Sequence, residues 1–115
     1  MLTLYGIKNC DTVRKARKWL DAQAVAYAFQ DLREQAVPQQ QLQQWLQQLG
    51  WETVVNRRGT TWRQLDAGDK DAMDNNKALT LISQHPALIK RPVLQGPGIL
   101  QVGFSESNYT ELLKT

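Results

Sequence analysis

The first third of the chain combines short β-prone runs with a helical spacing of apolar positions. Residues 2–5 form a β-prone run that ends at Gly6, which predicts a strand followed by a loop over 6–9. After Cys10, apolar residues recur every three or four positions, as on one face of a helix: Val13, Ala16, Leu20 and Ala24. Residues 26–32 predict a second strand. A strand–helix–strand order of this length predicts a βαβ unit with parallel strands.

The middle of the chain has helical patterns that are repeatedly interrupted. Pro38 suits the first residue of a helix, and Gly50 ends the apolar series Leu42, Trp45, Leu46 and Leu49. From 52 to 86, Gly59 and Gly68 divide the chain into short helical segments. A further helix is indicated before His85 by Met73, Ala78, Leu81 and Ile82.

The last part of the chain predicts a hairpin and a helix. Residues 92–95 and 99–102 flank a Gly-Pro-Gly turn, which is typical of an antiparallel hairpin. Ser105 can cap a final helix whose core-facing residues would be Tyr109, Leu112 and Leu113. The order βαβ, helices, ββα predicts an α/β fold with a mixed sheet. We expect one domain over 1–115 with a helical insertion at about 37–86.

Composition and charge exclude several classes of function. The chain has 115 residues, 42% of them hydrophobic, and a formal net charge of +3. It has no apolar run near the ~20 residues of a membrane span and no signal-peptide pattern, so we expect a cytoplasmic protein without a membrane partner. Its basic residues form no dense stripe interleaved with aromatics, so we expect no nucleic-acid partner. We expect a monomer.

Cys10 is the only cysteine and the most reactive candidate in the chain. With His85 as the sole histidine, a disulfide within the chain and a Cys/His metal site are both excluded, so any partner sulfur must come from another molecule. A thiolate is favoured at a helix N-terminus, where the first N–H groups should point toward the sulfur. Lys8 and Arg14 add positive charge nearby, and Asp11 opposes it. The alternative is an inert buried cysteine.

Arginine supplies the second set of candidates. A guanidinium presents a planar fork of donors that suits a carboxylate or a tetrahedral oxyanion, and the candidates are Arg57, Arg58, Arg63 and Arg91. Taken one at a time, an arginine of this kind is more often a solvated surface residue than a site residue. Arg91 stands out because it precedes Pro92 at the start of a strand, where the peptide bond could be cis. His85 is expected only to end a helix.

Four segments in combination resemble a known family. They are residues 4–12 (LYGIKNCDT), 58–63 (RGTTWR), 85–92 (HPALIKRP) and 103–106 (GFSE). The chain is similar to the arsenate-reductase-like (ArsC/Spx) branch of the thioredoxin superfamily, and most similar to its YffB subgroup. The resemblance spans essentially the whole chain and implies a thioredoxin-like fold with an inserted helical subdomain.

The resemblance also implies roles for individual residues. Cys10 matches the family's nucleophile, Arg91 the arginine of its Arg-Pro motif, Arg58 approximately its middle-region arginine, and Pro92 the superfamily's cis-proline. The reductases carry His-Asn-Pro where Gly6-Ile7-Lys8 stands, serine at position 13 and arginine near position 103. The loss of these donors should weaken binding of a doubly charged oxyanion. Spx has a Cys-x-x-Cys pair where this chain has Cys10 and Val13.

We therefore expect a glutathione-dependent thiol oxidoreductase with Cys10 and Arg91 as catalytic residues. Its expected substrate-binding residues are Arg58, Thr12, Lys8, Arg14 and Pro92. Glutathione would be the co-substrate, a disulfide or glutathionylated molecule the substrate, and glutaredoxin a candidate partner; no metal is expected. The alternatives are an arsenate reductase and an Spx-like regulator that binds a large partner such as RNA polymerase.

Overall fold

The structure is a computed structural model that describes residues 1–114, and its internal contacts divide the chain into two compact units. The sheet unit contains residues 1–35 and the chain from Arg91 onward, and the helical unit contains residues 36–90. The predicted insertion at 37–86 lies within the range of the helical unit. The single-domain organisation stays a prediction.

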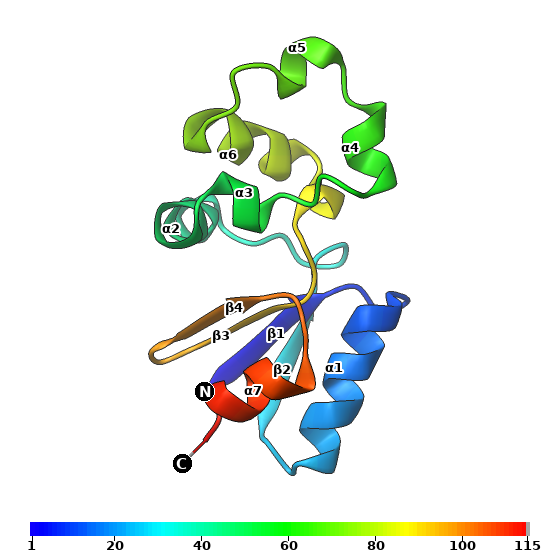
Figure 1. Cartoon of the computed structure of the whole chain (residues 1–115), viewed down its shortest axis with the longest axis vertical. Helices are drawn as coiled ribbons and strands as arrows, with labels where there is room; N and C mark the ends of the chain where they lie inside the picture. The colour runs from blue at the N-terminus through cyan, green and yellow to red at the C-terminus, as the bar shows by residue number, and fades with distance from the viewer. Residues whose placement is uncertain (115) are drawn as a thin grey trace. The chain divides into compact units, whose positions relative to one another are not determined.

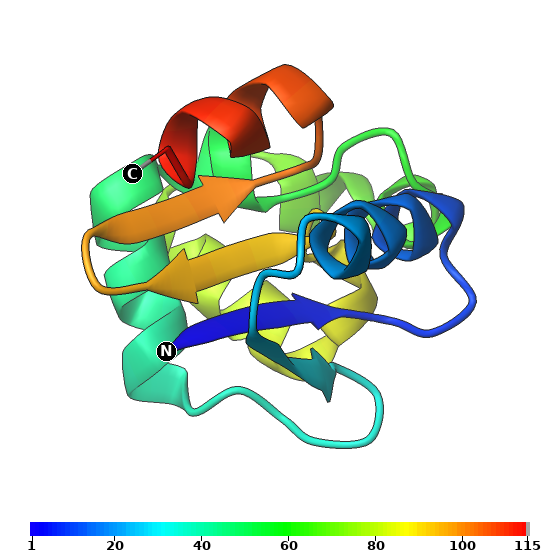
Figure 2. The same ribbon diagram turned by 90° about the horizontal axis from the view of Figure 1, so that it is seen from below.

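The sheet unit is built on four strands, β1 (Leu2–Gly6), β2 (Tyr27–Asp31), β3 (Val93–Gly96) and β4 (Ile99–Val102). Their order in the sheet is β2-β1-β3-β4 (Figures 1 and 2). β1 and β2 are parallel, whereas β1–β3 and β3–β4 are antiparallel. The predicted βαβ unit, hairpin and mixed sheet are therefore confirmed.

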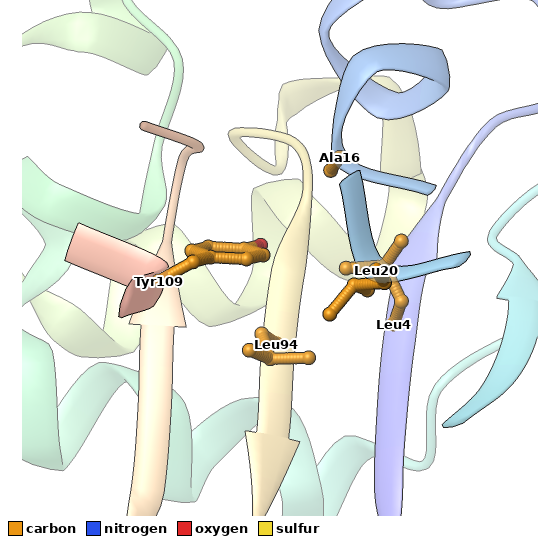
Figure 3. Packing of buried hydrophobic residues seen from close by; sticks show 5 residues of the cluster. All are labelled: Leu4, Ala16, Leu20, Leu94 and Tyr109. Atoms are coloured by element: carbon orange, nitrogen blue, oxygen red, sulfur yellow. The ribbon is translucent and has the colours of Figure 1, made fainter. Parts of the chain in front are cut away.

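Two helices, α1 (Asp11–Ala22) and α7 (Glu106–Leu112), cover one face of this sheet. Leu4 of β1 and Leu94 of β3 are register partners, so their side chains point to the same face. They form a fully buried cluster with Ala16 and Leu20 of α1 and Tyr109 of α7 (Figure 3). The packing of α1 on the sheet follows from the three- and four-residue spacing of its buried positions.

The helical unit consists of short helices joined by turns: α2 (Gln39–Leu49), α3 (Trp51–Val54), α4 (Thr60–Gln64), α5 (Ala67–Lys70), α6 (Asn75–Gln84) and the 3₁₀ helix η1 (Pro86–Leu88). α2 packs against α6. The side chain of Asn75 in α6 donates to Leu46 O of α2 at 3.2 Å and accepts from Trp51 N of α3 at 3.1 Å. The predicted series of short helices is confirmed. His85 lies at the C-cap of α6, as expected.

Several predicted boundaries were wrong. Ala24 is exposed and lies beyond the helix, because the chain leaves α1 at Ala22 and Ala24 adopts a left-handed φ of 56°. Pro38 is the N-cap of α2 rather than its first residue, with an extended ψ of 142°. Met73 precedes α6, because the carboxylate of Asp74 caps the helix one residue later by accepting from Lys77 N.

Two smaller predictions also need correction. Gly68 lies inside α5 instead of separating two segments, since one helical turn tolerates a glycine at modest cost. Of the two leucines expected to face the core beside Tyr109, Leu113 packs against the buried cluster from just beyond the end of α7. Leu112 stays half-buried and outside that cluster.

Candidate functional site

The strand register brings distant segments to one edge of the sheet. Tyr5 pairs with Val93, so the loop that leaves β1 lies beside the Arg91–Pro92 peptide that enters the antiparallel β3. Gly103, which follows β4, joins this edge by donating from its N–H to Pro92 O at 2.8 Å. This edge of the sheet unit therefore combines the predicted nucleophile with one of the predicted arginines.

Cys10 is the N-cap of α1, as the sequence predicted, and its side chain is half-buried. Its backbone is extended (φ −94°, ψ 127°), and its carbonyl accepts from Arg14 N at 2.9 Å. Cys10 makes no side-chain cap hydrogen bond, and the orientation of the first-turn N–H groups toward the sulfur stays a prediction. Sulfur is a weak acceptor, and cysteine is not among the favoured N-cap residues. The sulfur thus lies at a helix N-terminus whose first N–H groups it leaves available.

The predicted substrate-binding residues around Cys10 are all exposed. The Lys8 ammonium forms an ion pair with Glu34 at 2.8 Å, and the Arg14 guanidinium forms one with Asp11. Thr12 lies in the first turn of α1. Exposed ion pairs are weak and exchange readily, so both cations can turn toward an anion at the sulfur.

Arg91 and Pro92 directly precede β3. The peptide bond between them is cis, as the resemblance implied. Arg91 is half-buried with its Nε shielded from solvent, and Pro92 is buried. A guanidinium in this position can present its outer nitrogens to a ligand while its stem stays packed.

Arg58 belongs to the helical unit, whereas Cys10 belongs to the sheet unit. It lines a pocket of about 260 Å³, together with Glu52, Val55, Asn56, Arg57 and Lys90. Asn56 Oδ1 accepts from Arg58 N at 3.1 Å, and Arg63 donates to Arg58 O at 2.7 Å. Arg63 therefore supports the backbone of Arg58. Arg57 lies over the Trp51 ring, 5.2 Å from its centroid.

Asp31 is a site residue that the sequence analysis missed. It ends β2 as the one buried charged residue among those described, and it accepts hydrogen bonds from Arg33 N at 2.8 Å and Lys8 N at 3.1 Å. Burial alone would raise the pKa of this carboxyl. The two N–H donors and the charges of Arg33 and Lys8 outweigh burial, and the pKa lies below its ordinary value. The available signal was its place at the carboxyl end of a parallel strand.

Two further properties bear on function. Among residues 1–114, no three His, Cys, Asp or Glu side chains gather in a way that could hold a metal ion. None of the helices in this part of the chain has the length and apolar character needed to cross a membrane.

Comparison of the sequence with known proteins gives a consistent result. The model of the ArsC family matches residues 5–112. An uncharacterised protein of Haemophilus influenzae is 43% identical over 109 residues, which cover 95% of this chain and 96% of that protein. The global transcriptional regulator Spx of Streptococcus agalactiae is 30% identical over 115 residues, covering 98% of this chain and 83% of the regulator.

Solved structures agree with this result. A protein described as YffB is 45% identical, covers 98% of this chain and 99% of its own, and superposes with a TM-score of 0.95. An arsenate reductase (ArsC) related protein from Brucella melitensis is 38% identical, covers 99% and 95%, and has a TM-score of 0.78. The predicted thioredoxin-like α/β fold is confirmed.

Proposed function

The chain belongs to the ArsC family, and we propose that it is an arsenate-reductase-like thiol oxidoreductase in which Cys10 is the nucleophile. One observation carries the proposal: the lone cysteine is half-buried at the N-terminus of a twelve-residue helix whose first N–H groups it leaves uncapped. Free N–H groups at a helix N-terminus can hydrogen-bond an anion, which suits the attacking sulfur of the proposed reaction. A cysteine that only fills space in the core would not need to lie at a helix N-terminus.

The proposed reaction is thiol–disulfide exchange with glutathione. The Cys10 thiolate attacks one sulfur of a glutathionylated substrate, a new disulfide forms between Cys10 and glutathione, and the substrate sulfur leaves as a thiolate. A second glutathione thiolate then attacks this mixed disulfide. Oxidised glutathione is released and the Cys10 thiolate returns. In sum, one glutathionylated substrate and one glutathione thiol become one free substrate thiol and one oxidised glutathione, and the chain itself is unchanged.

The arginines would orient the carboxylates of glutathione or another charged group. Arg91 is suited to this because it enters the sheet edge that carries the Cys10 loop, and a guanidinium binds a carboxylate in two-pronged fashion. Arg58 belongs to the helical unit, and its role stays a prediction. Lys8, Thr12 and Arg14 would supply further polar contacts, and the Pro92 ring would border the bound tripeptide.

The test is turnover of a glutathionylated peptide with reduced glutathione, glutathione reductase and NADPH. Wild type should consume NADPH and should form a mixed disulfide with glutathione at Cys10, detected by mass spectrometry. Arg91→Ala should raise KM. Arg17→Ala is the control, because the Arg17 guanidinium lies over the Phe29 ring and has no proposed contact with the substrate. No mixed disulfide and no turnover would refute the proposal.

Arsenate reduction is a second candidate, favoured by the arsenate-reductase-related relative from Brucella melitensis. The valine at position 13 and the glycine at position 103 argue against it, because neither side chain can donate to an oxyanion. The test is whether the purified protein reduces arsenate when glutathione and glutaredoxin are supplied. Turnover of arsenate in preference to the glutathionylated peptide would replace the first proposal.

Regulation of an Spx type is a third candidate, favoured by the identity to the Streptococcus agalactiae regulator over 98% of the chain. In that case the chain would dock on a large partner such as RNA polymerase, and the sulfur would not be needed for docking. Binding of RNA polymerase that is equal in wild type and Cys10→Ser would support this candidate.

A further inference from the structure

We propose that Asp31 positions the nucleophilic sulfur, because its buried carboxylate fixes the backbone of the loop that carries Cys10. The proposal rests on the proposed function in taking Cys10 as the reactive residue. Asp31 contacts the loop from 23 residues further along the sequence. It acts on the loop and not on the substrate, so it is a positioning residue.

The carboxylate ties two segments together. Gly6 and Asp31 are register partners at the ends of β1 and β2, and Leu32 N donates to Gly6 O at 2.8 Å. One carboxylate oxygen, Oδ2, accepts from Lys8 N at 3.1 Å, and the other, Oδ1, accepts from Arg33 N at 2.8 Å. The loop after β1 and the turn after β2 are thereby held by a single side chain.

The anchored backbone is close to the sulfur along the chain. Only Asn9 separates Lys8 from Cys10, and Cys10 N donates to Ile7 O at 3.3 Å. Each residue contributes two soft backbone dihedrals, so a fixed Lys8 leaves few rotations that could move Cys10. On its other side Cys10 is fixed by α1. The position of the sulfur therefore depends on the hydrogen bond at Lys8.

The other side-chain contacts between these segments are exposed and weaker. The Lys8 ammonium lies 2.8 Å from Glu34, and Arg33 Nη2 donates to Asn9 Oδ1 at 3.2 Å. Water competes for both, and exposed ion pairs contribute little. The Asp31 side chain is only 2% exposed, so water cannot replace its contacts.

A carboxylate is the group that this geometry requires. Two backbone N–H donors approach its two oxygens, and a carboxylate offers acceptors at both. Asparagine has the same shape, but its NH₂ group would face one of the two N–H donors. Asp31→Asn therefore removes the charge and leaves one of the two part-buried N–H donors without its acceptor.

The experiment compares Asp31→Asn with Asp11→Asn. The second variant removes a carboxylate adjacent to Cys10 that is exposed and pairs with Arg14, so it changes charge near the sulfur without touching the loop. For each protein we would measure amide hydrogen exchange at Lys8 and Arg33, the rate of Cys10 alkylation by iodoacetamide at pH 7, and kcat and KM with a glutathionylated peptide.

Positioning predicts opposite results for the two variants. In Asp31→Asn, exchange at Lys8 or Arg33 should accelerate at least about tenfold, and kcat should fall about 10- to 100-fold with a smaller change in KM. In Asp11→Asn, both amides should stay protected and alkylation should equal or exceed the wild-type rate, because removing a nearby negative charge favours the thiolate. If amide exchange at Lys8 and Arg33 and alkylation of Cys10 in Asp31→Asn proceed at the wild-type rates, the proposal is overturned.

A measurement on wild type decides the question if Asp31→Asn does not fold. The pKa of Asp31 is lowered, so its charged form and the anchor persist above the ordinary value of 3.8 and are lost as pH falls through the lowered value. The charged groups that face it are Lys8 and Arg33, with Glu34 paired to Lys8. The amide resonances of Lys8 and Arg33 should shift with one common midpoint below pH 3.8. If the Lys8 and Arg33 amides shift with different midpoints, the proposal that Asp31 anchors the loop is overturned. Failure of the proposed function would appear separately, as the absence of turnover by the wild-type protein.

Discussion

The helices α1 and α7 both belong to the sheet unit, and the N-cap residue of each has an extended backbone. The two N-cap residues differ in the side-chain atom that they place at the helix end. At α7, Ser105 Oγ accepts from Asn108 N at 3.2 Å. At α1, the corresponding residue is Cys10, and its sulfur makes no cap hydrogen bond. The first turn of α1 thus keeps its donors available for an anion, whereas in α7 the Ser105 hydroxyl already occupies the N–H of Asn108.

The difference shows how each helix is stabilised. α1 has twelve residues and buries Val13, Ala16 and Leu20 against the sheet, so packing stabilises it without a cap. α7 has seven residues and buries only Tyr109, so its cap contributes a larger share. A well-packed helix can therefore do without an N-cap hydrogen bond, and its first N–H groups stay available to bind a ligand.

The largest expected effect comes from replacing the Cys10 sulfur by a hydroxyl. Cys10→Ser should abolish turnover of a glutathionylated peptide, because an alcohol does not perform thiol–disulfide exchange. The serine hydroxyl should accept from a first-turn N–H and make the variant about 1 kcal/mol more stable than Cys10→Ala. Urea unfolding and the NADPH-coupled assay measure the two effects. Equal stability of serine and alanine variants would show that the geometry of this end excludes a cap.

Packing at the start of α1 can be tested at Gly6. A Cβ on Gly6 would lie 2.7 Å from Val13 Cγ2, and the β-branched Val13 is stiff and fully buried. Gly6→Ala should therefore lower the free energy of unfolding by about 1–3 kcal/mol. In a Val13→Ala background the same change should cost much less. An equal cost in both backgrounds would locate the strain elsewhere than in this contact.

Removing the cap of α7 should have a smaller effect. Ser105→Ala should lower the free energy of unfolding by about 1 kcal/mol, because Asn108 N loses its acceptor. Ser107→Ala is a matched control in the same turn, because it removes the 3.5 Å contact between the Ser107 and Ser105 hydroxyls and leaves the cap bond to Asn108 N in place. Urea midpoints that fall equally for both variants would contradict the role of Ser105 as the cap.

These elements also show what the sequence could predict. The spacing of Val13, Ala16 and Leu20, the turn residues between β3 and β4, and Ser105 before α7 are local signals, and the structure agrees with each. The hydrogen bond from Lys8 N to Asp31 joins residues 23 positions apart, and no local pattern encodes it.

The missing cap at Cys10 could not be predicted either, because it depends on the geometry of one side chain. The roles of Arg91 and Arg58 stay predictions.

The smallest expected effect concerns the residue that anchors α7. Tyr109 packs edge-on against Phe104 and Trp19, with ring centroids 4.8 and 5.8 Å away, and its buried hydroxyl has no hydrogen-bond partner among residues 1–114. Burial accordingly raises the pKa of Tyr109. Tyr109→Phe keeps both ring contacts and removes a desolvated hydroxyl, so it should stabilise the protein by up to about 1 kcal/mol.

Tyr27→Phe is the control for this prediction, because the Tyr27 hydroxyl accepts from Arg17 Nε at 3.4 Å and its loss should be neutral or slightly destabilising. The melting temperatures of the two variants should therefore move apart. A lower melting temperature for Tyr109→Phe would mean that the hydroxyl is hydrogen-bonded in solution. The short helix α7 would then depend on a polar contact in its core as well as on the Ser105 cap, and the contrast with α1 would be greater.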